Sequence, residues 1–356
     1  MSTPELGLIE GFYGRPWSWQ ERAETVAWLG ARGYRFYLYA PKADLYLRRR
    51  WREPHPPELA GPLSELASEV RAAGVRFGVG LSPFEAWLDF GDEARRALRE
   101  KLRFLNQIGV QDLAVLFDDM RGDQPDLAQR QLEIVDFICG QTRASRIIVC
   151  PSYYSDDPVL DRVFGHRPPR YLEQLGAGLD PEIQIFWTGE EVVSRELSVA
   201  HLRHVGQLLG RKPFLWDNYP VNDGQRMSQY LHLRAFTGRP SSIGQHIAAH
   251  GINVASQPTL TRIPALTLVD SYRRGADYAY GRELRRAAVE VLGGELGARL
   301  WEDVLVLQDV GLDRLGEEKE RVLRERWGGV DHPGAREIIE WLDGGYRITD
   351  EIVHTQ

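Results

Sequence analysis

DLAVLFDD, residues Asp112–Asp119, is an apolar run of strand-forming residues that ends in two adjacent acids. Seven other short apolar runs, rich in β-branched and aromatic residues, alternate with longer stretches of helical periodicity at intervals of roughly 35 residues. The eight expected strands are GLIEGFY from Gly7, RFYLYAPK from Arg35, RFGVGLSP from Arg76, DLAVLFDD from Asp112, RIIVCPSYY from Arg146, IQIFWTG from Ile183, KPFLWDNY from Lys212 and GINVASQ from Gly251. Eight strand–helix units of this size predict an α/β fold, a (β/α)8 TIM-like barrel.

The segments between the strands favour the same fold. Residues Ser18–Gly33 and Asp92–Gly109 have helical periodicity. Three glycines stand where a helix ends before a strand: Gly33, Gly74 and Gly109. An open doubly wound sheet is the main alternative, but it usually carries a glycine-rich phosphate loop after its first strand, and GFYGRPW from Gly11 is not one. The proline-rich run REPHPPELAGP after Trp51 predicts a loop between the second strand and its helix.

After Tyr280 the strand signal stops and only helical patterns remain. The expected helices are Arg282–Leu296, Leu300–Leu315 and Ala335–Leu342, and the charged run EEKERVLRER is typical of a solvated helix face. We therefore expect a barrel over residues 1–280 and a C-terminal helical appendage over residues 281–356.

Composition limits the classes of partner. The 356 residues include 44 Lys plus Arg and 51 Asp plus Glu, a net charge of −7, which argues against nucleic acid or an anionic membrane surface as the main partner. No stretch has the length of apolar sequence that a membrane span needs, and the N-terminal sequence does not look like a secretion signal. Cys139 and Cys150 form no CxxC pair, so we expect reduced thiols and a cytoplasmic location.

Active sites of such barrels form at the C-terminal ends of the strands. The side chains expected there are mostly carboxylates, amides and aromatic rings, which suit a neutral ligand rich in hydroxyl groups, such as a sugar, and suit a phosphate poorly. They are Glu10, Gly11, Tyr13, Lys42, Asp44, Asp118, Asp119, Tyr154, Trp187, Thr188, Trp216, Asn218, Asp223 and Asn253.

The pair Asp118–Asp119 is the sharpest local signal. Like charges at close range raise the pKa of one member, which predicts one protonated and one ionised carboxyl group near neutral pH. A glycosidase needs that division between a proton donor and a carboxylate that stabilises positive charge. The same pair could instead bind a metal ion or cap a helix.

Two acids from one strand end cannot easily flank a sugar from opposite sides. A substrate-assisted mechanism removes that difficulty, because the 2-acetamido oxygen of the substrate is then the nucleophile. The enzyme needs only an acid/base and a group that orients the acetamide, and one strand end can supply both.

Six motifs, in this order, resemble glycoside hydrolase family 84, which contains the O-GlcNAcases and related β-N-acetylglucosaminidases. They are EGFYGRPWSWQER from Glu10, YAPKAD from Tyr39, LFDDM from Leu116, CPSYY from Cys150, WTG from Trp187 and WDNYPVND from Trp216. Together they cover roughly residues 7–275, each at an expected strand end.

The resemblance implies roles for individual residues. Asp118 would bind and polarise the acetamido N–H, and Asp119 would be the general acid and then the general base. Tyr154 would hydrogen-bond near the acetamido oxygen, and Trp216 would wall the acetamide pocket. The sugar itself would be held by Asn218, by Asp223 at the 4- and 6-hydroxyls, by the Gly11 carbonyl, by the Lys42 ammonium and by Asn253.

The eighth strand departs from the family pattern. Family members commonly read Asn-Pro-Met-Asn-Gln-Pro there, whereas this chain reads NVASQP from Asn253, so Val254 and Ala255 replace Pro and Met. Aligning on Gln257 and Pro258 places Asn253 at the sugar-binding asparagine. Ala43 replaces an acid that is common after the lysine.

The interpretation is a retaining exo-β-N-acetylglucosaminidase that works through an oxazoline intermediate, with no cofactor and no metal. The expected substrate is the terminal β-linked GlcNAc of glycoproteins or oligosaccharides, and the natural aglycone stays open. The alternatives are a GlcNAc-binding protein without turnover and a metal-dependent barrel hydrolase.

The run Arg48–Arg50 is interpreted as a solvated loop face. Because some family members complete a dimer groove with helices after the barrel, a homodimer through the C-terminal helices is possible.

Overall fold

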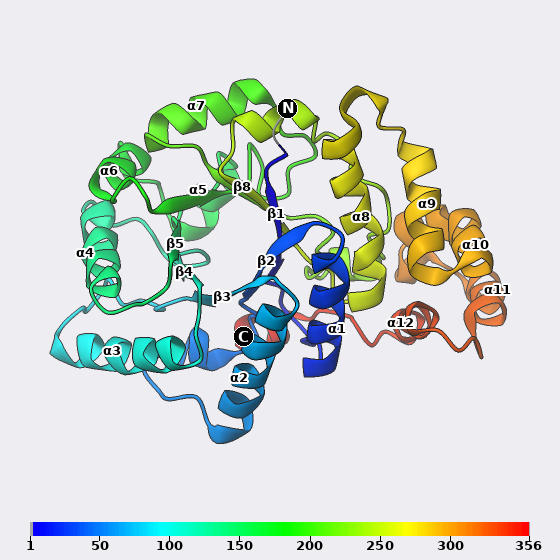
Figure 1. The fold of residues 1–356 in the computed structure, drawn as a ribbon, viewed down its shortest axis with the longest axis horizontal. Coiled ribbons are helices and arrows are strands. Elements are labelled where there is room, and N and C mark those ends of the chain that lie inside the picture. Colours follow the sequence, from blue (N-terminus) through cyan, green and yellow to red (C-terminus); the bar gives the residue numbers. More distant parts are fainter. Residues whose placement is uncertain (1–2, 356) are drawn as a thin grey trace.

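A computed structural model describes residues 3–355 and contains a closed barrel of eight parallel strands, in the order β1 to β8 (Figure 1). The strands are β1 (Glu5–Glu10), β2 (Tyr34–Tyr39), β3 (Arg76–Leu81), β4 (Asp112–Leu116), β5 (Arg146–Cys150), β6 (Gln184–Trp187), β7 (Phe214–Asp217) and β8 (Ala249–Asn253). All eight expected strands and the (β/α)8 fold class are confirmed. In strand β4 every residue is buried, as is typical of a parallel strand covered on both faces.

Helices between the strands and after the last of them form the outer layer of the barrel (Figure 1). They are α1 (Trp19–Gly30), α2 (Pro57–Ala72), α3 (Asp92–Gln107), α4 (Leu127–Cys139), α5 (Pro158–Phe164), α6 (Tyr171–Gly178), α7 (Val199–Leu209) and α8 (Pro258–Arg274). Helix α1 begins at a capping box, in which Ser18 accepts from the backbone N–H of Glu21 and Glu21 accepts from that of Ser18. The glycines expected to terminate helices at 33, 74 and 109 all have positive φ angles, of 118°, 74° and 76°.

The loop predicted for the proline-rich run after Trp51 is shorter than expected, because the second half of the run is helical. Helix α2 already begins at Pro57, with Pro56 at its N-cap, and Pro62 lies inside the helix. Proline is tolerated in the first helical turn because the N–H that it lacks would have had no partner there.

Four charged side chains close the end of the barrel opposite the strand C-termini. Arg76 donates to Glu5 (2.6 Å) and to Asp112 (3.2 Å), and Arg146 pairs with the same two carboxylates. Each of the four is the first residue of its strand. The opposite end of the barrel is therefore the one available to a ligand.

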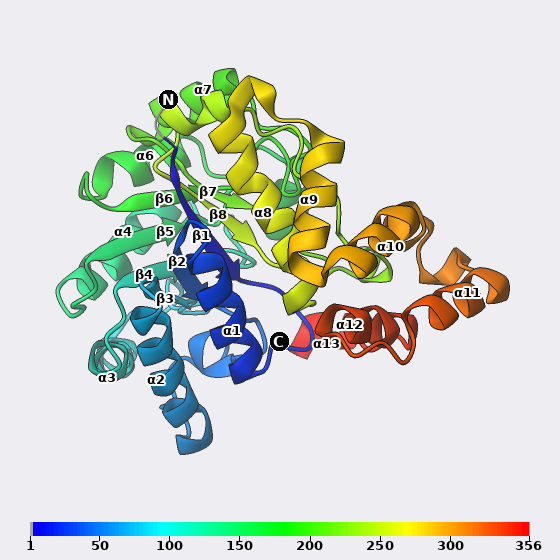
Figure 2. The ribbon, with the colours of Figure 1, turned by 45° about the vertical axis from the view of Figure 1, so that its right-hand side comes forward.

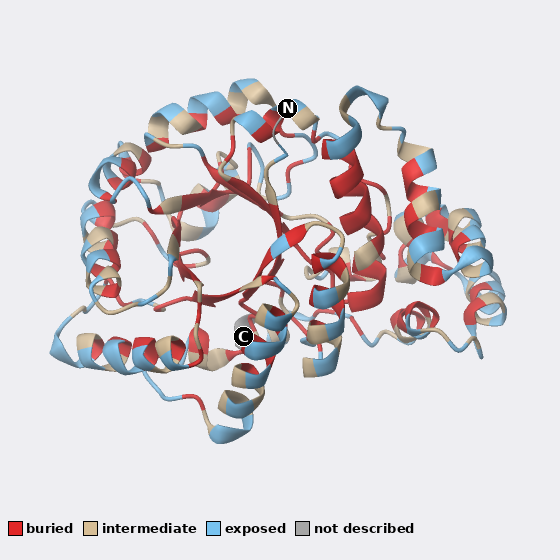
Figure 3. Ribbon diagram, viewed as in Figure 1, coloured by how far each residue is buried: buried red, intermediate tan, exposed pale blue. Residues whose placement is uncertain are grey.

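The C-terminal helices form a second layer beyond α8, to one side of the barrel (Figure 2). They are α9 (Tyr280–Leu292), α10 (Gly294–Leu305), α11 (Glu317–Trp327), α12 (Pro333–Leu342) and α13 (Asp350–Thr355). A second apolar cluster joins α9–α12 to α8, which is buried over most of its length (Figure 3). The division at residue 280 stays a prediction, and residues 1, 2 and 356 lie outside the described part of the chain.

Two of the expected C-terminal helices have other limits. The stretch Arg282–Leu296 is divided between α9 and α10 at Gly293, whose φ of 86° stops the first helix. The stretch Leu300–Leu315 is also divided, because α10 passes into a π-helical turn over Val306–Val310 and ends at Gly311, whose φ is 81°. Helix α12 agrees with the expected Ala335–Leu342. Within residues 3–355, none of the helices combines the length and the apolar character needed to cross a bilayer.

Candidate active site

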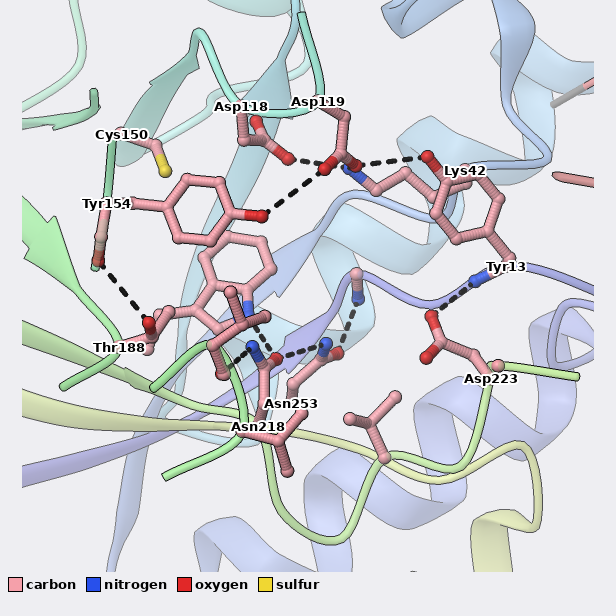
Figure 4. Close-up of a pocket in the computed structure, with 16 residues that line it drawn as sticks. Tyr13, Lys42, Asp118, Asp119, Cys150, Tyr154, Thr188, Asn218, Asp223 and Asn253 are labelled. Atoms are coloured by element: carbon pink, nitrogen blue, oxygen red, sulfur yellow. Dashed lines mark hydrogen bonds and ion pairs between the residues drawn. The ribbon is translucent and has the colours of Figure 1, made fainter. Parts of the chain in front are cut away.

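A cavity of about 300 Å³ opens at the C-terminal ends of the strands (Figure 4). The nine residues proposed from the sequence for catalysis or sugar binding all line it. The complete lining is Gly11, Tyr13, Lys42, Asp118, Asp119, Cys150, Tyr154, Thr188, Val192, Val193, Trp216, Asn218, Val221, Asp223, Gly224 and Asn253. The chain thus brings together residues from the ends of seven strands, those of β1, β2, β4, β5, β6, β7 and β8.

The two adjacent acids follow strand β4, and their backbone turns sharply between them. Asp119 has a φ of 55°, the left-handed region that non-glycine residues seldom adopt. This conformation turns the chain directly after Asp118, so that both carboxyl groups line the cavity and reach the same cation. Backbone strain of this kind persists where surrounding contacts fix the residue, and it is common at functional sites.

The ammonium group of Lys42 lies between the two carboxylates (Figure 4). Its Nζ is 2.7 Å from Oδ2 of Asp118 and 3.1 Å from Oδ2 of Asp119. Oδ1 of Asp118 is buried and has no hydrogen-bond partner among residues 3–355. A buried carboxylate oxygen without a donor is costly, so a ligand N–H that reached it would be bound favourably.

Lys42 changes the expected protonation of the pair. Burial works to raise the pKa of Asp119, but the Lys42 ammonium and the Arg48 guanidinium outweigh burial and hold that pKa below its ordinary value. The expectation that repulsion between the two acids raises the pKa of one of them does not hold for Asp119, because a buried cation bonds to both carboxylates.

Two tyrosine hydroxyl groups contact the Asp119 carboxylate from different strands. The Tyr13 hydroxyl, after β1, donates to Oδ2 at 3.0 Å, and the Tyr154 hydroxyl, after β5, lies 3.4 Å from Oδ1. Burial, with the nearby Asp119 charge, raises the pKa of both tyrosines well above the ordinary value, so both hydroxyl groups keep their protons. The Asp119 carboxylate is consequently bound more closely at Oδ2 than at Oδ1.

The opposite wall of the cavity is a hydrogen-bonded unit of one indole and two amides. Oδ1 of Asn218 accepts from Nε1 of Trp216 and from Nδ2 of Asn253, both at 3.0 Å. Oδ1 of Asn253 accepts from the backbone N–H of Gly11 at 3.1 Å. A Cβ atom at Gly11 would lie 2.4 Å from Cζ2 of Trp216, so only glycine leaves room for this indole.

Asp223 lies on the same side of the cavity as the start of the β1 loop. Its Oδ2 accepts from the backbone N–H of Tyr13 at 2.9 Å. Burial raises the pKa of this carboxyl group to about 6, despite that hydrogen bond and the charge of Lys42. Asp223 is thus an acceptor that titrates just below neutral pH.

Three other strand-end residues lie outside the cavity lining. Glu10 is fully buried and pairs with Arg22 (2.8 Å), and Asp44 caps a short 3-10 helix and accepts from Tyr39. Trp187 was expected at the site because it stands at the end of its strand. Its side chain points away from the cavity and donates from Nε1 to His201 (2.9 Å). Alternation of side chains along a strand explains this, since neighbours face opposite sides of the sheet.

Some lining residues were given no role from the sequence. Tyr13 and Thr188 follow strand ends and lie within two of the six family motifs, and these two features could have identified them as site residues. Val192 and Val193 come from the loop after β6, and no pattern marked them.

Burial and the neighbouring Asp118 raise the pKa of the Cys150 thiol well above its ordinary value, so it faces the cavity as a neutral thiol.

The basic run Arg48–Arg50 is only partly a solvated face. Arg49 and Arg50 are exposed, but Arg48 is buried, with 4% of its surface accessible, and its Nη2 donates to the Tyr13 hydroxyl at 3.2 Å. Over the described part of the chain, no three His, Cys, Asp or Glu residues gather in a way that could hold a metal ion.

Comparisons with known proteins agree with the motifs. A family model described as β-N-acetylglucosaminidase matches residues 6–303. The protein O-GlcNAcases of Mus musculus and Rattus norvegicus are each 31% identical over 246 residues, which is 67% of this chain and 26% of theirs. The chain thus spans about a quarter of the length of these curated relatives.

A solved structure shows the same likeness over nearly the whole chain. A mutant of the Thermobaculum terrenum O-GlcNAc hydrolase matches with a TM-score of 0.78 and 28% sequence identity, covering 96% of this chain and 80% of that one. Since the family model matches residues 6–303, which is well over half of the chain, the chain belongs to the β-N-acetylglucosaminidase family, glycoside hydrolase family 84.

Proposed function

We propose that the protein is a retaining exo-β-N-acetylglucosaminidase that removes terminal β-linked GlcNAc by substrate-assisted catalysis. The observation that carries this proposal is the pair Asp118–Asp119 in a cavity of about 300 Å³, with Lys42 bonded to both carboxylates. A cavity at the small end of ligand pockets suits a single sugar unit at a chain end.

In the first step the acetamido oxygen of the substrate attacks C1 and the glycosidic C1–O bond breaks. Asp118 accepts the acetamido N–H as the amide carbon becomes positive, and its unpaired Oδ1 supplies the acceptor. Asp119 gives its proton to the departing oxygen. The product of this step is the oxazoline intermediate in its protonated, oxazolinium form, whose N–H stays hydrogen-bonded to Asp118 in the cavity.

In the second step a water molecule attacks C1 from the side that the aglycone has left. Asp119, now a carboxylate, takes the proton of that water, and the oxazoline opens to the acetamide. Two displacements at C1 retain the β configuration. Asp119 must therefore bind a proton in the loaded enzyme, which loss of water from the occupied cavity favours.

The remaining lining residues fit the recognition of one GlcNAc unit. Trp216 offers an aromatic wall for the acetamide methyl group, and Tyr154 a hydroxyl beside the reacting centre. Asn218, Asp223, Asn253, Lys42 and the Gly11 carbonyl group are proposed to bind the sugar hydroxyls. The aglycone extends over the rim, so glycoproteins and oligosaccharides are both proposed as substrates.

The direct test is release of 4-nitrophenol from 4-nitrophenyl β-N-acetylglucosaminide, with 4-nitrophenyl β-glucoside as the control and EDTA present. Turnover of the acetamido sugar alone, unchanged by EDTA, is the expected result. Equal turnover of the glucoside would contradict substrate assistance. Loss of turnover with EDTA would favour a metal-dependent hydrolase, and GlcNAc binding without turnover would favour a sugar-binding protein.

The compartment and the assembly are further proposals. Neither cysteine is in a disulfide, as expected for a protein of a reducing cytoplasm. A homodimer through the C-terminal helices is proposed on the resemblance described above.

A further inference from the structure

Arg48 is a buried cation at the edge of the candidate active site. It follows β2, and its guanidinium lies 5.7 Å from the ring centre of Tyr13 and 5.4 Å from that of Phe84. Tyr13 follows β1 and Phe84 follows β3, so Arg48 is held between the loops of the two neighbouring strands. Burying a guanidinium costs free energy unless its donors are used, which points to a specific role.

The hydrogen bonds of Arg48 lead to the proposed general acid. Nη2 of Arg48 donates to the Tyr13 hydroxyl at 3.2 Å, and that hydroxyl donates to Oδ2 of Asp119 at 3.0 Å. A hydroxyl that accepts from a cation becomes a better donor, because successive hydrogen bonds polarise one another. Through the Tyr13 hydroxyl, the arginine therefore strengthens the contact at Oδ2.

The two oxygens of Asp119 are held unequally as a result. Oδ2 also lies 3.1 Å from Nζ of Lys42, whereas Oδ1 has the Tyr154 hydroxyl at 3.4 Å. A proton on Oδ2 would face two donors, so the neutral acid is favoured with its proton on Oδ1.

We propose that Arg48 is a positioning residue for Asp119: through the Tyr13 hydroxyl it fixes Oδ2, so that the carboxyl group exchanges its catalytic proton at Oδ1. This inference rests on the proposed function. It assigns Arg48 no contact with substrate.

Several charged or titratable groups face Asp119 from the surrounding strands. They are Tyr13 after β1, Lys42 and Arg48 after β2, Asp118 after β4, Cys150 and Tyr154 from β5 and its loop, and Asp223 after β7. Of these, Tyr13 and Lys42 bond to Oδ2 of Asp119. Removing the charge of Arg48 also raises the pKa of Asp119, because Arg48 is one of the cations that lower it.

The experiment compares Arg48→Met, Tyr13→Phe and the double variant with the unmodified protein. Arg49→Met is the matched control, because Arg49 is the exposed neighbour and its guanidinium also lies over the Phe84 ring, at 5.3 Å. Each is assayed from pH 4 to 9 on aryl β-N-acetylglucosaminides with a good and a poor leaving group. Thermal denaturation shows which variants are folded, and Tyr13→Phe preserves the test if Arg48→Met does not fold.

We expect Arg48→Met to lower kcat/KM about 10-fold to 100-fold for the poor leaving group and much less for the good one, as for a misplaced proton donor. The alkaline limb of the pH profile of kcat, which reports the loaded enzyme, should move to higher pH, because a cation that lowers the pKa of Asp119 has been removed. The double variant should lose no more on the poor leaving group than Tyr13→Phe alone, because both changes interrupt one chain. Arg49→Met should match the unmodified protein.

Three results would overturn the inference. They are equal losses for both leaving groups in Arg48→Met and Tyr13→Phe, an alkaline limb that does not move in Arg48→Met, and additive losses in the double variant. In each case the unmodified protein still hydrolyses the acetamido sugar, so the proposed function stands. An unmodified protein without turnover of either aryl glycoside would instead contradict the proposed function itself.

Discussion

Asp118 and Asp119 are neighbours in the chain but have different surroundings, and this difference predicts different mutant behaviour. Asp118 bonds to Lys42 through one oxygen, and its other oxygen has no partner within residues 3–355, whereas both oxygens of Asp119 lie near donors. The first arrangement suits a carboxylate that accepts an N–H, and the second a group that exchanges a proton.

Asp119→Asn should lower kcat by about 100-fold to 10,000-fold for aryl N-acetylglucosaminides with poor leaving groups, and far less for activated ones that need little protonation. Asp118→Asn should reduce both, because both leaving groups pass through the same oxazoline. The measurement is kcat across a series of phenols of increasing pKa. Parallel losses across that series in both variants would contradict the roles.

Asp223 gives a prediction of opposite effects on stability and binding. Its pKa in the folded protein, about 6, lies above the ordinary value of 3.8, so ionisation of this buried carboxyl group adds no penalty below about pH 4 and destabilises the fold progressively as pH rises from there through about 6. Asp223→Asn should therefore raise the free energy of unfolding by about 2 kcal/mol at pH 8 and by little at pH 4.

The same variant should raise KM, because Asp223 is proposed to bind two sugar hydroxyls. Urea denaturation at both pH values, with KM measured at pH 8, tests both parts. A stability gain of the same size at pH 4 and pH 8 would show that titration of Asp223 is not its cause.

The residue types at the site were predictable from the sequence, and the state of their protons was not. Strand ends and motifs identified nine of the residues that line the cavity. The low pKa of Asp119 and the burial of Arg48 depend on distances between loops that follow different strands. A run of three arginines looks like a solvated surface until the β1 and β3 loops are known to enclose its first member.

At the scale of elements, one side chain connects the C-terminal helices to the barrel. The carboxyl group of Glu337, on α12, accepts from the backbone N–H groups of Thr259 (2.7 Å) and Leu260 (2.9 Å), in the first turn of α8. These are N–H groups that a helix N-terminus leaves without partners of its own. Glu337 thus caps the last barrel helix from outside the barrel.

Glu337→Ala should lower the free energy of unfolding by about 1–3 kcal/mol, since two buried donors lose their acceptor. Glu337→Gln keeps the shape and one acceptor oxygen and should lose less. Urea denaturation at pH 6 makes the comparison, with Glu318→Ala as the control because that side chain is 76% exposed on α11. If Glu337→Ala were as stable as Glu318→Ala, capping of α8 by Glu337 would not contribute to stability.

Strands were easier to predict than the limits of the last helices. An apolar run that recurs at the interval of one strand–helix unit predicts a buried strand, because a barrel strand is covered on both faces. The C-terminal helices are interrupted by Gly293 and Gly311, both with positive φ, and helical periodicity continues through such glycines in the sequence. The docking of α9 and α10 on α8, rather than periodicity, decides where each helix stops.

At the scale of the molecule, the predicted homodimer has a candidate surface on the C-terminal helices. Three apolar side chains there are exposed: Val289 (44%), Leu305 (61%) and Val322 (38%). We expect a dimer in sedimentation velocity. Leu305→Glu should raise the dissociation constant at least about tenfold, the equivalent of about 1.4 kcal/mol, because it would place an unpaired charge at the interface.

Val163→Glu, on α5 of the barrel, is the control, since Val163 is also exposed (64%) and lies far along the chain from the C-terminal helices. A single species with the mass of one chain at all concentrations would disprove the dimer.

Helix α8 packs on the barrel with one face and on the C-terminal helices with another, and of the residues from 258 to 272 only Arg262 is not buried. If only one of the two apolar cores unfolded, the face of α8 that packs on that core would be exposed to water while α8 stayed bound to the other core. The two cores should therefore melt in one cooperative transition rather than in turn. In native-state hydrogen exchange, the amides of α8 would then exchange only through global unfolding, which makes this helix the slowest-exchanging segment outside the strands.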